Sequence, residues 1–206
     1  DAINELIIGD PNWEANGPAE KGMLHVYKFT PLTAMANMGG ESGSTTTIVA
    51  ILQFVNPISP GELSSPDMSV TLIAELAGQN ENWFGSSLSG VASGSASNYL
   101  LVGSPRMETS LSGPVPGGEV FLYRDDPNTI ELDLEQILTI QDTYSSTEPG
   151  QFGIAVASVG DIDGNDGADE FIVGAPQTDL LEIDAGYAKV FDVDGNVILS
   201  ILGTVA

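Results

Sequence analysis

One pattern of strand and turn residues occurs three times along the chain. Each copy has an apolar run ending in Gly-x-Pro, a short loop, and a second run that starts at a glycine and reaches an aromatic residue. Proline lacks a backbone N–H and glycine permits a sharp bend, so Gly-x-Pro ends a strand. Because the loops are too short for a helical crossover, each copy predicts two antiparallel strands. The copies are ELIIGDP with GMLHVYK (5–11, 22–28), YLLVGSP with GEVFLYR (99–105, 118–124), and EFIVGAP with GYAKVFD (170–176, 186–192).

Further runs extend the copies to four strands each. Phe-Gly opens WFGSSLSGVA (83–92) and QFGIAVASVG (151–160) ahead of the second and third copies, whereas the first copy lacks this strand. Corresponding glycines of the second and third copies are about 70 residues apart, enough for four short strands. The pattern predicts an all-β protein of four-stranded antiparallel blades in a propeller-type array. A single β-sandwich is the alternative, although it does not require the same turns to recur in phase. The predicted fourth strands are 68–76, 135–140 and 196–202.

Charge and composition exclude several classes of function. The chain has 5 Lys and Arg against 29 Asp and Glu, a formal net charge of −24. A nucleic-acid-binding protein needs a basic face, and an anionic membrane surface would repel this chain too. Hydrophobic residues make up 42% of the sequence, so there is enough apolar material for a core.

The sequence offers little for catalysis or membrane insertion. Cysteine is absent and histidine occurs once, which removes thiol nucleophiles, disulfides and multi-histidine metal sites. No two carboxylates stand out as a catalytic pair, so we expect no enzyme activity. His25 lies inside a predicted strand and is expected to pack across it. The apolar run Ile48 to Val55 is far shorter than the roughly 20 residues that span a bilayer.

The segment DIDGNDGAD has the spacing of a cation-binding loop. Side-chain oxygens occur at alternate positions, and Ca²⁺ takes six to eight hard oxygen ligands from such a loop, whereas Mg²⁺ retains more water. A helix-loop-helix calcium site is excluded because Asp166 and Ile172 stand where that loop needs Gly and Glu. A solvated acidic turn is the alternative interpretation. The predicted Ca²⁺ ligands are Asp161, Asp163, Asn165, Gly167 through its carbonyl, and Asp169.

The order of Phe-Gly, acidic loop, strand ending in Gly-Ala-Pro and glycine restart resembles the FG-GAP repeat of integrin α-subunit β-propellers. The likeness is strongest at 151–193, fair at 84–124 and partial at 2–28. It implies an extracellular or cell-surface protein whose calcium ligands stand at loop positions 1, 3, 5, 7 and 9, which are the residues named above. One departure is Asp166, where the family often has glycine. It implies either an unusual backbone angle or a loop shifted by one residue.

The resemblance also sets the expected organisation. Residues 1–206 form a single propeller segment, with a partial blade at 1–77 that carries an insertion at about 30–66, and further blades at 78–140 and 141–206. A closed propeller of this family has seven blades. The roughly three blades here are therefore expected to form an array that is incomplete at both ends. It would be a fragment, a trimmed chain, or a chain that other chains complete. The insertion run Ile48 to Val55 is expected to form an added strand or a contact surface.

Other loops carry weaker cation signals. The loop of the second unit, within 89–99, has no carboxylate and is expected to bind no cation. Asp1 and Asn4 align with the end of the 161–169 loop, which suggests a second cation loop there. The run from Asp192 to Asn196 contains Asp-Gly between two strands and predicts a hairpin turn.

Propeller geometry, as the resemblance implies, places ligand loops on the face opposite the cation hairpins. Trp13 and Trp83 fall in those loops, and a tryptophan in a polar loop can stack on a sugar or anchor a protein. Trp83 precedes Phe-Gly and could instead be wedged between blades. The expected function is a calcium-stabilised, non-enzymatic module for adhesion or recognition, with a protein or glycan ligand. One alternative is a structural subunit of an extracellular filament or sheath, which self-assembles with further blades or copies through the blade edges. The other is a lectin-like accessory propeller.

Overall fold

The computed structural model describes the strands and the turns next to them. In the described part there are twelve strands and no helix, which confirms the all-β prediction. The described residues are 4–14, 21–31, 47–53, 68–78, 83–92, 98–105, 117–125, 134–142, 151–165, 167–176 and 185–203.

The strands form three four-stranded sheets, each built from one continuous stretch of chain. The first sheet has the order β3-β1-β2-β4, with β1 at Asn4–Asp10, β2 at Met23–Pro31, β3 at Thr47–Gln53 and β4 at Met68–Ala77. The second has the order β5-β6-β7-β8, with β5 at Ser87–Ala92, β6 at Asn98–Ser104, β7 at Glu119–Asp125 and β8 at Leu134–Gln141. The third has the order β9-β10-β11-β12, with β9 at Ala155–Gly160, β10 at Glu170–Ala175, β11 at Tyr187–Phe191 and β12 at Val197–Leu202. The four strands predicted for the second and third units are thus confirmed.

Strand β3 supplies the edge strand that the first repeat lacks. In the second and third sheets this position belongs to β5 and β9, which follow the Phe-Gly turns and run antiparallel to their neighbours. In the first sheet β3 comes from the insertion and runs parallel to β1, with Leu6 opposite Ala50 and Gly9 opposite Gln53. The insertion run is therefore an added strand, one of its two predicted forms. The predicted propeller had no place for a parallel pair, and the long connection from β2 to β3 is what permits it.

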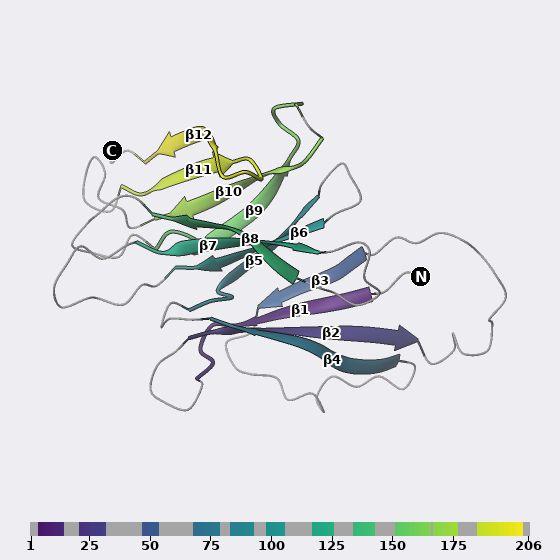
Figure 1. Ribbon diagram of the computed structural model, residues 1–206. Coiled ribbons are helices and arrows are strands. Elements are labelled where there is room, and N and C mark those ends of the chain that lie inside the picture. Colours follow the sequence, from purple (N-terminus) through teal and green to yellow (C-terminus); the bar gives the residue numbers. More distant parts are fainter. Residues whose placement is uncertain are drawn as a thin grey trace.

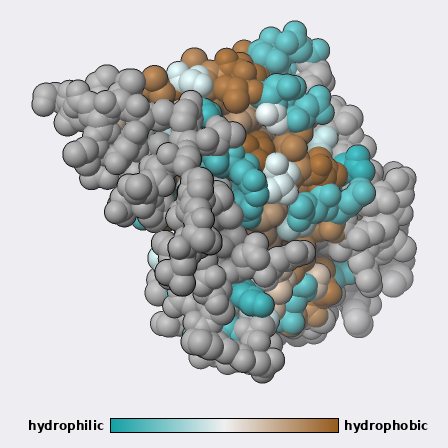
Figure 2. All heavy atoms as spheres, turned by 60° about the vertical axis from the view of Figure 1, so that its left-hand side comes forward, coloured by the Kyte–Doolittle hydropathy of each residue, from teal (hydrophilic) through white to brown (hydrophobic). Residues whose placement is uncertain are grey.

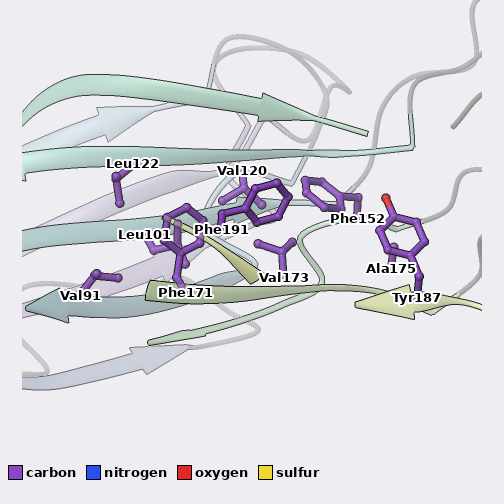
Figure 3. Close-up of a cluster of buried hydrophobic side chains, with 10 residues drawn as sticks. All are labelled: Val91, Leu101, Val120, Leu122, Phe152, Phe171, Val173, Ala175, Tyr187 and Phe191. Atoms are coloured by element: carbon purple, nitrogen blue, oxygen red, sulfur yellow. The ribbon is translucent and has the colours of Figure 1, made fainter. Parts of the chain in front are cut away.

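The three sheets stack face to face, with the second sheet in the middle (Figure 1). Alternate residues of each strand point to opposite faces, so the second sheet contributes to both layers of core. Leu100 and Val102 pack toward the first sheet, against Ile7 and Val26. The other layer lies between the second and third sheets (Figure 3) and contains Val91, Leu101, Val120, Leu122, Phe152, Phe171, Val173, Ala175, Tyr187 and Phe191.

Each sheet turns an equivalent face toward the next sheet in sequence, and we call this its forward face. On the first sheet the strand positions of this face are Ile7, Gly9, Leu24, Val26, Ala74 and Leu76. On the second sheet they are Leu101, Gly103, Val120, Leu122, Leu138 and Ile140. The cross-strand register makes the two sets equivalent, position by position.

The Phe-Gly turns join one sheet to the next. Phe84 is buried in the core between the first two sheets, and Phe152 in the core between the last two. Each phenylalanine N–H donates to the preceding sheet's connection, at Lys21 O (3.3 Å) and Gly117 O (2.7 Å). The following glycine N–H donates to the sheet that the turn begins, as Gly153 N does to Gly174 O at 3.0 Å. The turn backbone is therefore shared between two sheets.

Two glycines of each preceding sheet make room for the turn. A Cβ atom at Gly9 would overlap the carbonyl oxygen of Gly85, and one at Gly103 would overlap that of Gly153. The restart glycines Gly22 and Gly118 likewise face the carbonyl oxygens of the phenylalanines. The glycines of Gly-x-Pro and of the restart therefore do more than end and start strands: they leave space for the backbone of the next Phe-Gly turn.

We predict that Gly103→Ala destabilises the protein because the added methyl group meets backbone and the hydroxyl of Ser87. Overpacking of this kind costs about 2 kcal/mol, and we expect the melting temperature to fall by roughly 4–8 °C. Gly90→Ala is the matched control, because Gly90 lies in β5 and has no atom within 4 Å of an added Cβ. Thermal unfolding followed by circular dichroism measures both. Equal melting temperatures for the two variants would contradict the close-approach interpretation.

Candidate metal centre

The loop between β9 and β10 brings three carboxylates together. One oxygen each from Asp161, Asp163 and Glu170 lies within 4.8 Å of the others. Asp161 and Asp163 are exposed, whereas Glu170 is only 2% exposed. The cluster therefore has a solvent side and a buried side.

Hydrogen bonds inside the loop fix these side chains. Asp161 Oδ1 accepts from Gly164 N at 2.6 Å, and Asp163 Oδ1 accepts from Asn165 N at 2.8 Å. Glu170 Oε2 accepts from Ile162 N at 2.5 Å, which ties the start of β10 to the start of the loop. Aspartate and asparagine favour such turns because their short side chains can bond backbone two or three residues on.

The structure brings together only part of the predicted ligand set. The side chain of Asn165 is next to the cluster, since its Nδ2 donates to Asp163 Oδ2 at 2.9 Å. Gly167 lies in the exposed part of the loop with φ +73°. Asp169 is engaged elsewhere: its Oδ2 accepts from Ser158 Oγ at 2.7 Å and from Ala92 N at 3.4 Å. Its backbone N–H donates to Ala92 O at 2.8 Å, so Asp169 links the loop to the second sheet.

Sequence reasoning missed Glu170, although a signal for it existed. Glu170 directly follows Asp169 and is a carboxylate at the start of the otherwise apolar strand EFIVGA. Gly164 and Gly167 both have positive φ in this loop, at 70° and 73°. Asp166 lies outside the described residues.

The chemistry of the cluster fits a hard cation. All three groups are carboxylates, and the ion pairs of the described part are His25 with Glu75 (3.0 Å) and Arg124 with Glu135 (2.6 Å). In the described part, then, no basic side chain pairs with the cluster. Oxygen-only donor sets of this kind suit Ca²⁺ better than metals that prefer nitrogen or sulfur. The residues that would hold the ion are Asp161, Asp163 and Glu170.

The other acidic runs differ from this loop. Asp192 Oδ1 accepts from Asn196 N at 2.7 Å, and Gly195 has φ +86°, which confirms the predicted hairpin turn between β11 and β12. Asn4 begins β1, and Asp1 lies outside the described residues. Most of the second unit's loop, 93–97, also lies outside them.

The two predicted recognition residues converge on one segment. The carbonyl of Trp13 accepts from Lys21 N at 3.0 Å and from Gly22 N at 3.3 Å, closing the connection between β1 and β2. Trp83 directly precedes Phe84, whose N–H donates to Lys21 O. Both tryptophan side chains are half-buried. They lie at the ends of the strands where Gly-x-Pro occurs, whereas the acidic cluster lies where β10 begins.

Asp10 is a buried carboxyl that the sequence analysis did not single out. It is the middle residue of the first Gly-x-Pro, where the other copies have Ser104 and Ala175, and all three positions are at most 2% exposed. Burial raises the pKa of Asp10 above its ordinary 3.8, and the Asn12 backbone N–H and the charge of His25 lower it by less. The signal in the sequence was an aspartate where the repeat otherwise has a small residue.

Comparison with known proteins adds no family assignment: no family model matches the chain, and no curated protein matches it. Within the described residues, no helix has the length and hydrophobicity to cross a bilayer.

We predict that Asp10→Ser stabilises the protein increasingly as pH rises. Below pH 3.8 the carboxyl of Asp10 is protonated in both the folded and the unfolded protein. As the pH rises above 3.8, the carboxyl ionises in the unfolded chain but stays protonated in the folded protein, because burial raises its pKa there. The free energy of unfolding of the wild type therefore falls until the pH reaches the raised pKa of Asp10. Urea unfolding of both proteins from pH 3.5 to 7 measures the difference. The free energy of unfolding of the variant should rise relative to that of the wild type as the pH rises, and the difference should then become constant. A difference that moves the other way would show that the ionised carboxylate is favoured in the fold.

Proposed function

We propose that the protein is a calcium-stabilised, non-enzymatic module for adhesion or recognition outside the cell, built as a segment of an FG-GAP-type β-propeller. The observation that carries the proposal is the carboxylate cluster of Asp161, Asp163 and Glu170. It occupies the loop between the first two strands of a four-stranded sheet, where the repeat pattern predicts a cation.

The arrangement of the sheets supports a blade-like interpretation. The second and third sheets carry their strands in chain order, whereas β3 takes the first position in the first sheet. The first strands of the second and third sheets, β5 and β9, lie beside each other. Ser158 N of β9 donates to Ser89 Oγ of β5 at 3.0 Å, and Ser87 Oγ donates to Gly153 O at 2.7 Å. Adjacent first strands are what a radial array requires, because these strands line its axis.

A bound Ca²⁺ would act on stability in this proposal. It would neutralise three carboxylates that otherwise repel one another and would hold the loop in its folded shape. Because Asp169 bonds Ala92, ordering the loop would also strengthen the contact between the second and third sheets. A ligand bound only by the folded state adds RT ln(1 + [L]/Kd) to the free energy of unfolding.

Recognition is assigned to the strand ends opposite the cluster. The backbone of Trp13 bonds the Lys21–Gly22 segment, which also bonds Phe84 next to Trp83, and both tryptophans are half-buried. Large rigid rings give contact area at low entropic cost, so they suit either a protein or a glycan ligand.

One observation favours the second candidate, a subunit that assembles with other repeats. Strand β12 is exposed along its length although its sequence is VILSIL. An apolar edge strand readily pairs or packs with another chain. A filament or sheath built through blade edges is compatible with this strand.

The calcium assignment predicts that Glu170→Gln removes the effect of Ca²⁺ on stability. With the wild type, Ca²⁺ at about one hundred times Kd adds about 2.7 kcal/mol, which raises the melting temperature by roughly 5–10 °C relative to chelator. Gln keeps a carbonyl oxygen for Ile162 N but removes the charge. Thermal unfolding with Ca²⁺ or with EGTA measures the shift.

Asp169→Asn is the matched control for that experiment. Asn keeps an acceptor for Ser158 and Ala92, and its side chain is outside the cluster, so the Ca²⁺ shift should persist. If Asp169→Asn abolishes the shift and Glu170→Gln does not, the ligand set is the one counted from Asp161. If the wild type shows no shift at millimolar Ca²⁺, the calcium proposal is wrong.

The recognition assignment predicts that Trp13→Ala weakens ligand binding without removing the calcium shift. Loss of an anchoring ring costs about 2 kcal/mol, or roughly thirtyfold in affinity. A glycan array probed with labelled protein, followed by titration of any glycan it identifies, measures this effect. A variant that binds normally but melts several degrees lower would show that Trp13 only packs.

A further inference from the structure

Strand β12 is an edge strand with exposed apolar side chains on both of its faces. It pairs with β11 on one side, and no strand of the described residues pairs with its other side. Figure 1 places β12 at the outer edge of the third sheet, and Figure 2 shows hydrophobic side chains grouped at that end of the described surface. The large apolar residues of the strand are 39–51% exposed: Val197, Ile198, Leu199, Ile201 and Leu202. The edge therefore offers a partner both backbone hydrogen-bonding groups and apolar contacts.

The equivalent strand of the second sheet is protected against such pairing. By cross-strand register, Gln136 and Gln141 of β8 occupy the positions that Val197 and Leu202 occupy in β12. Glu135 adds an exposed charge to β8, whereas β12 contains no charged residue. Polar and charged side chains on an edge strand disfavour pairing with another chain. Strand β12 lacks this protection at the same place in the fold.

The distribution of charge favours a second copy of this chain in antiparallel orientation. Asp192 and Asp194 lie in the hairpin that precedes β12, and the chain has a net charge of −24. In a parallel pair of β12 strands the two acidic hairpins would lie side by side, about 5 Å apart. In an antiparallel pair they lie at opposite ends of the strand, about 20 Å apart, which is more than twice the Debye length of about 8 Å at physiological salt.

We propose that β12 is a dimerisation surface, at which the β12 strands of two copies pair in antiparallel orientation about a two-fold axis. The axis lies at Ser200, so that Leu199 of each copy lies opposite Ile201 of the other on the same face of the joined sheet. Apolar cross-strand pairs of this kind stabilise an antiparallel sheet. Because the pair occupies the edge of both copies, assembly through β12 ends at two copies.

The inference rests on the second candidate of the proposed function, assembly through blade edges, and names the partner in that assembly. It depends neither on calcium nor on the tryptophans.

The size of the contact indicates a weak dimer. The exposed apolar residues of β12 present roughly 400 Å² per copy. With the backbone edge included, the pair buries on the order of 1,000 Å², which is near the lower limit for a specific protein interface. We therefore expect a dissociation constant in the micromolar range.

Sedimentation equilibrium from about 1 to 200 μM tests for this dimer. The wild type should change from monomer to dimer within that range. Ile201→Lys places a charge in the contact and should weaken association at least about tenfold. Ile137→Lys is the matched control, because it makes the same change at an exposed isoleucine of β8 and should leave association unchanged.

Single cysteines test the orientation and register, since the chain has no cysteine of its own. Ser200→Cys should oxidise to a disulfide-linked dimer, because residues opposite each other on the axis have the Cα separation of about 5.5 Å that a disulfide spans. Leu202→Cys is the matched variant. Its two copies would lie about 13 Å apart along the strands, beyond the roughly 7 Å limit, and should crosslink far more slowly.

Each contrary result overturns the proposal in a distinguishable way. A wild type that stays monomeric throughout would overturn both this proposal and the assembly candidate. An Ile201→Lys variant that dimerises like the wild type would assign the contact to another surface. Crosslinking of Ser200→Cys that is no faster than that of Leu202→Cys would exclude the two-fold antiparallel pair. EGTA leaves the dimer unchanged even where it abolishes the calcium shift, so the calcium proposal fails separately.

Discussion

The close approach of backbone between one sheet and the next is the interaction on which this structure depends. Each Phe-Gly turn lies against two glycines of the preceding sheet and shares its hydrogen bonds between both sheets. The contact sets the distance between sheets, and the alternating apolar side chains then fill the space. Because the same contact recurs, the forward faces of the first and second sheets are equivalent.

The same geometry positions the candidate metal centre. Register between β9 and β10 brings Gly160 opposite Glu170, so the loop closes with Glu170 beneath Asp161 and Asp163. Asp169 instead bonds Ala92 of the second sheet. One predicted ligand thus links two sheets, and Glu170 provides the third carboxylate of the cluster.

How far the sequence predicts the structure depends on the range of the interaction involved. The strand pairs and hairpin turns followed from Gly-x-Pro, Asp-Gly and alternating apolar residues, since these act within a few residues. The parallel pairing of β3 with β1 could not be predicted, because it is set by a long connection and not by any local signal. Nor could the engagement of Asp169 with Ala92, which depends on a residue of another sheet.

Stability in stacked repeats is approximately a sum of each unit's own stability and its contacts with neighbours. The second sheet gains contacts on both faces, whereas in the described residues the third sheet has a neighbour on one face only. The third sheet also carries the clustered carboxylates, whose mutual repulsion opposes folding when no cation is bound. A cation held by Asp161, Asp163 and Glu170 would therefore stabilise a sheet that, in the described residues, has a neighbour on one face only.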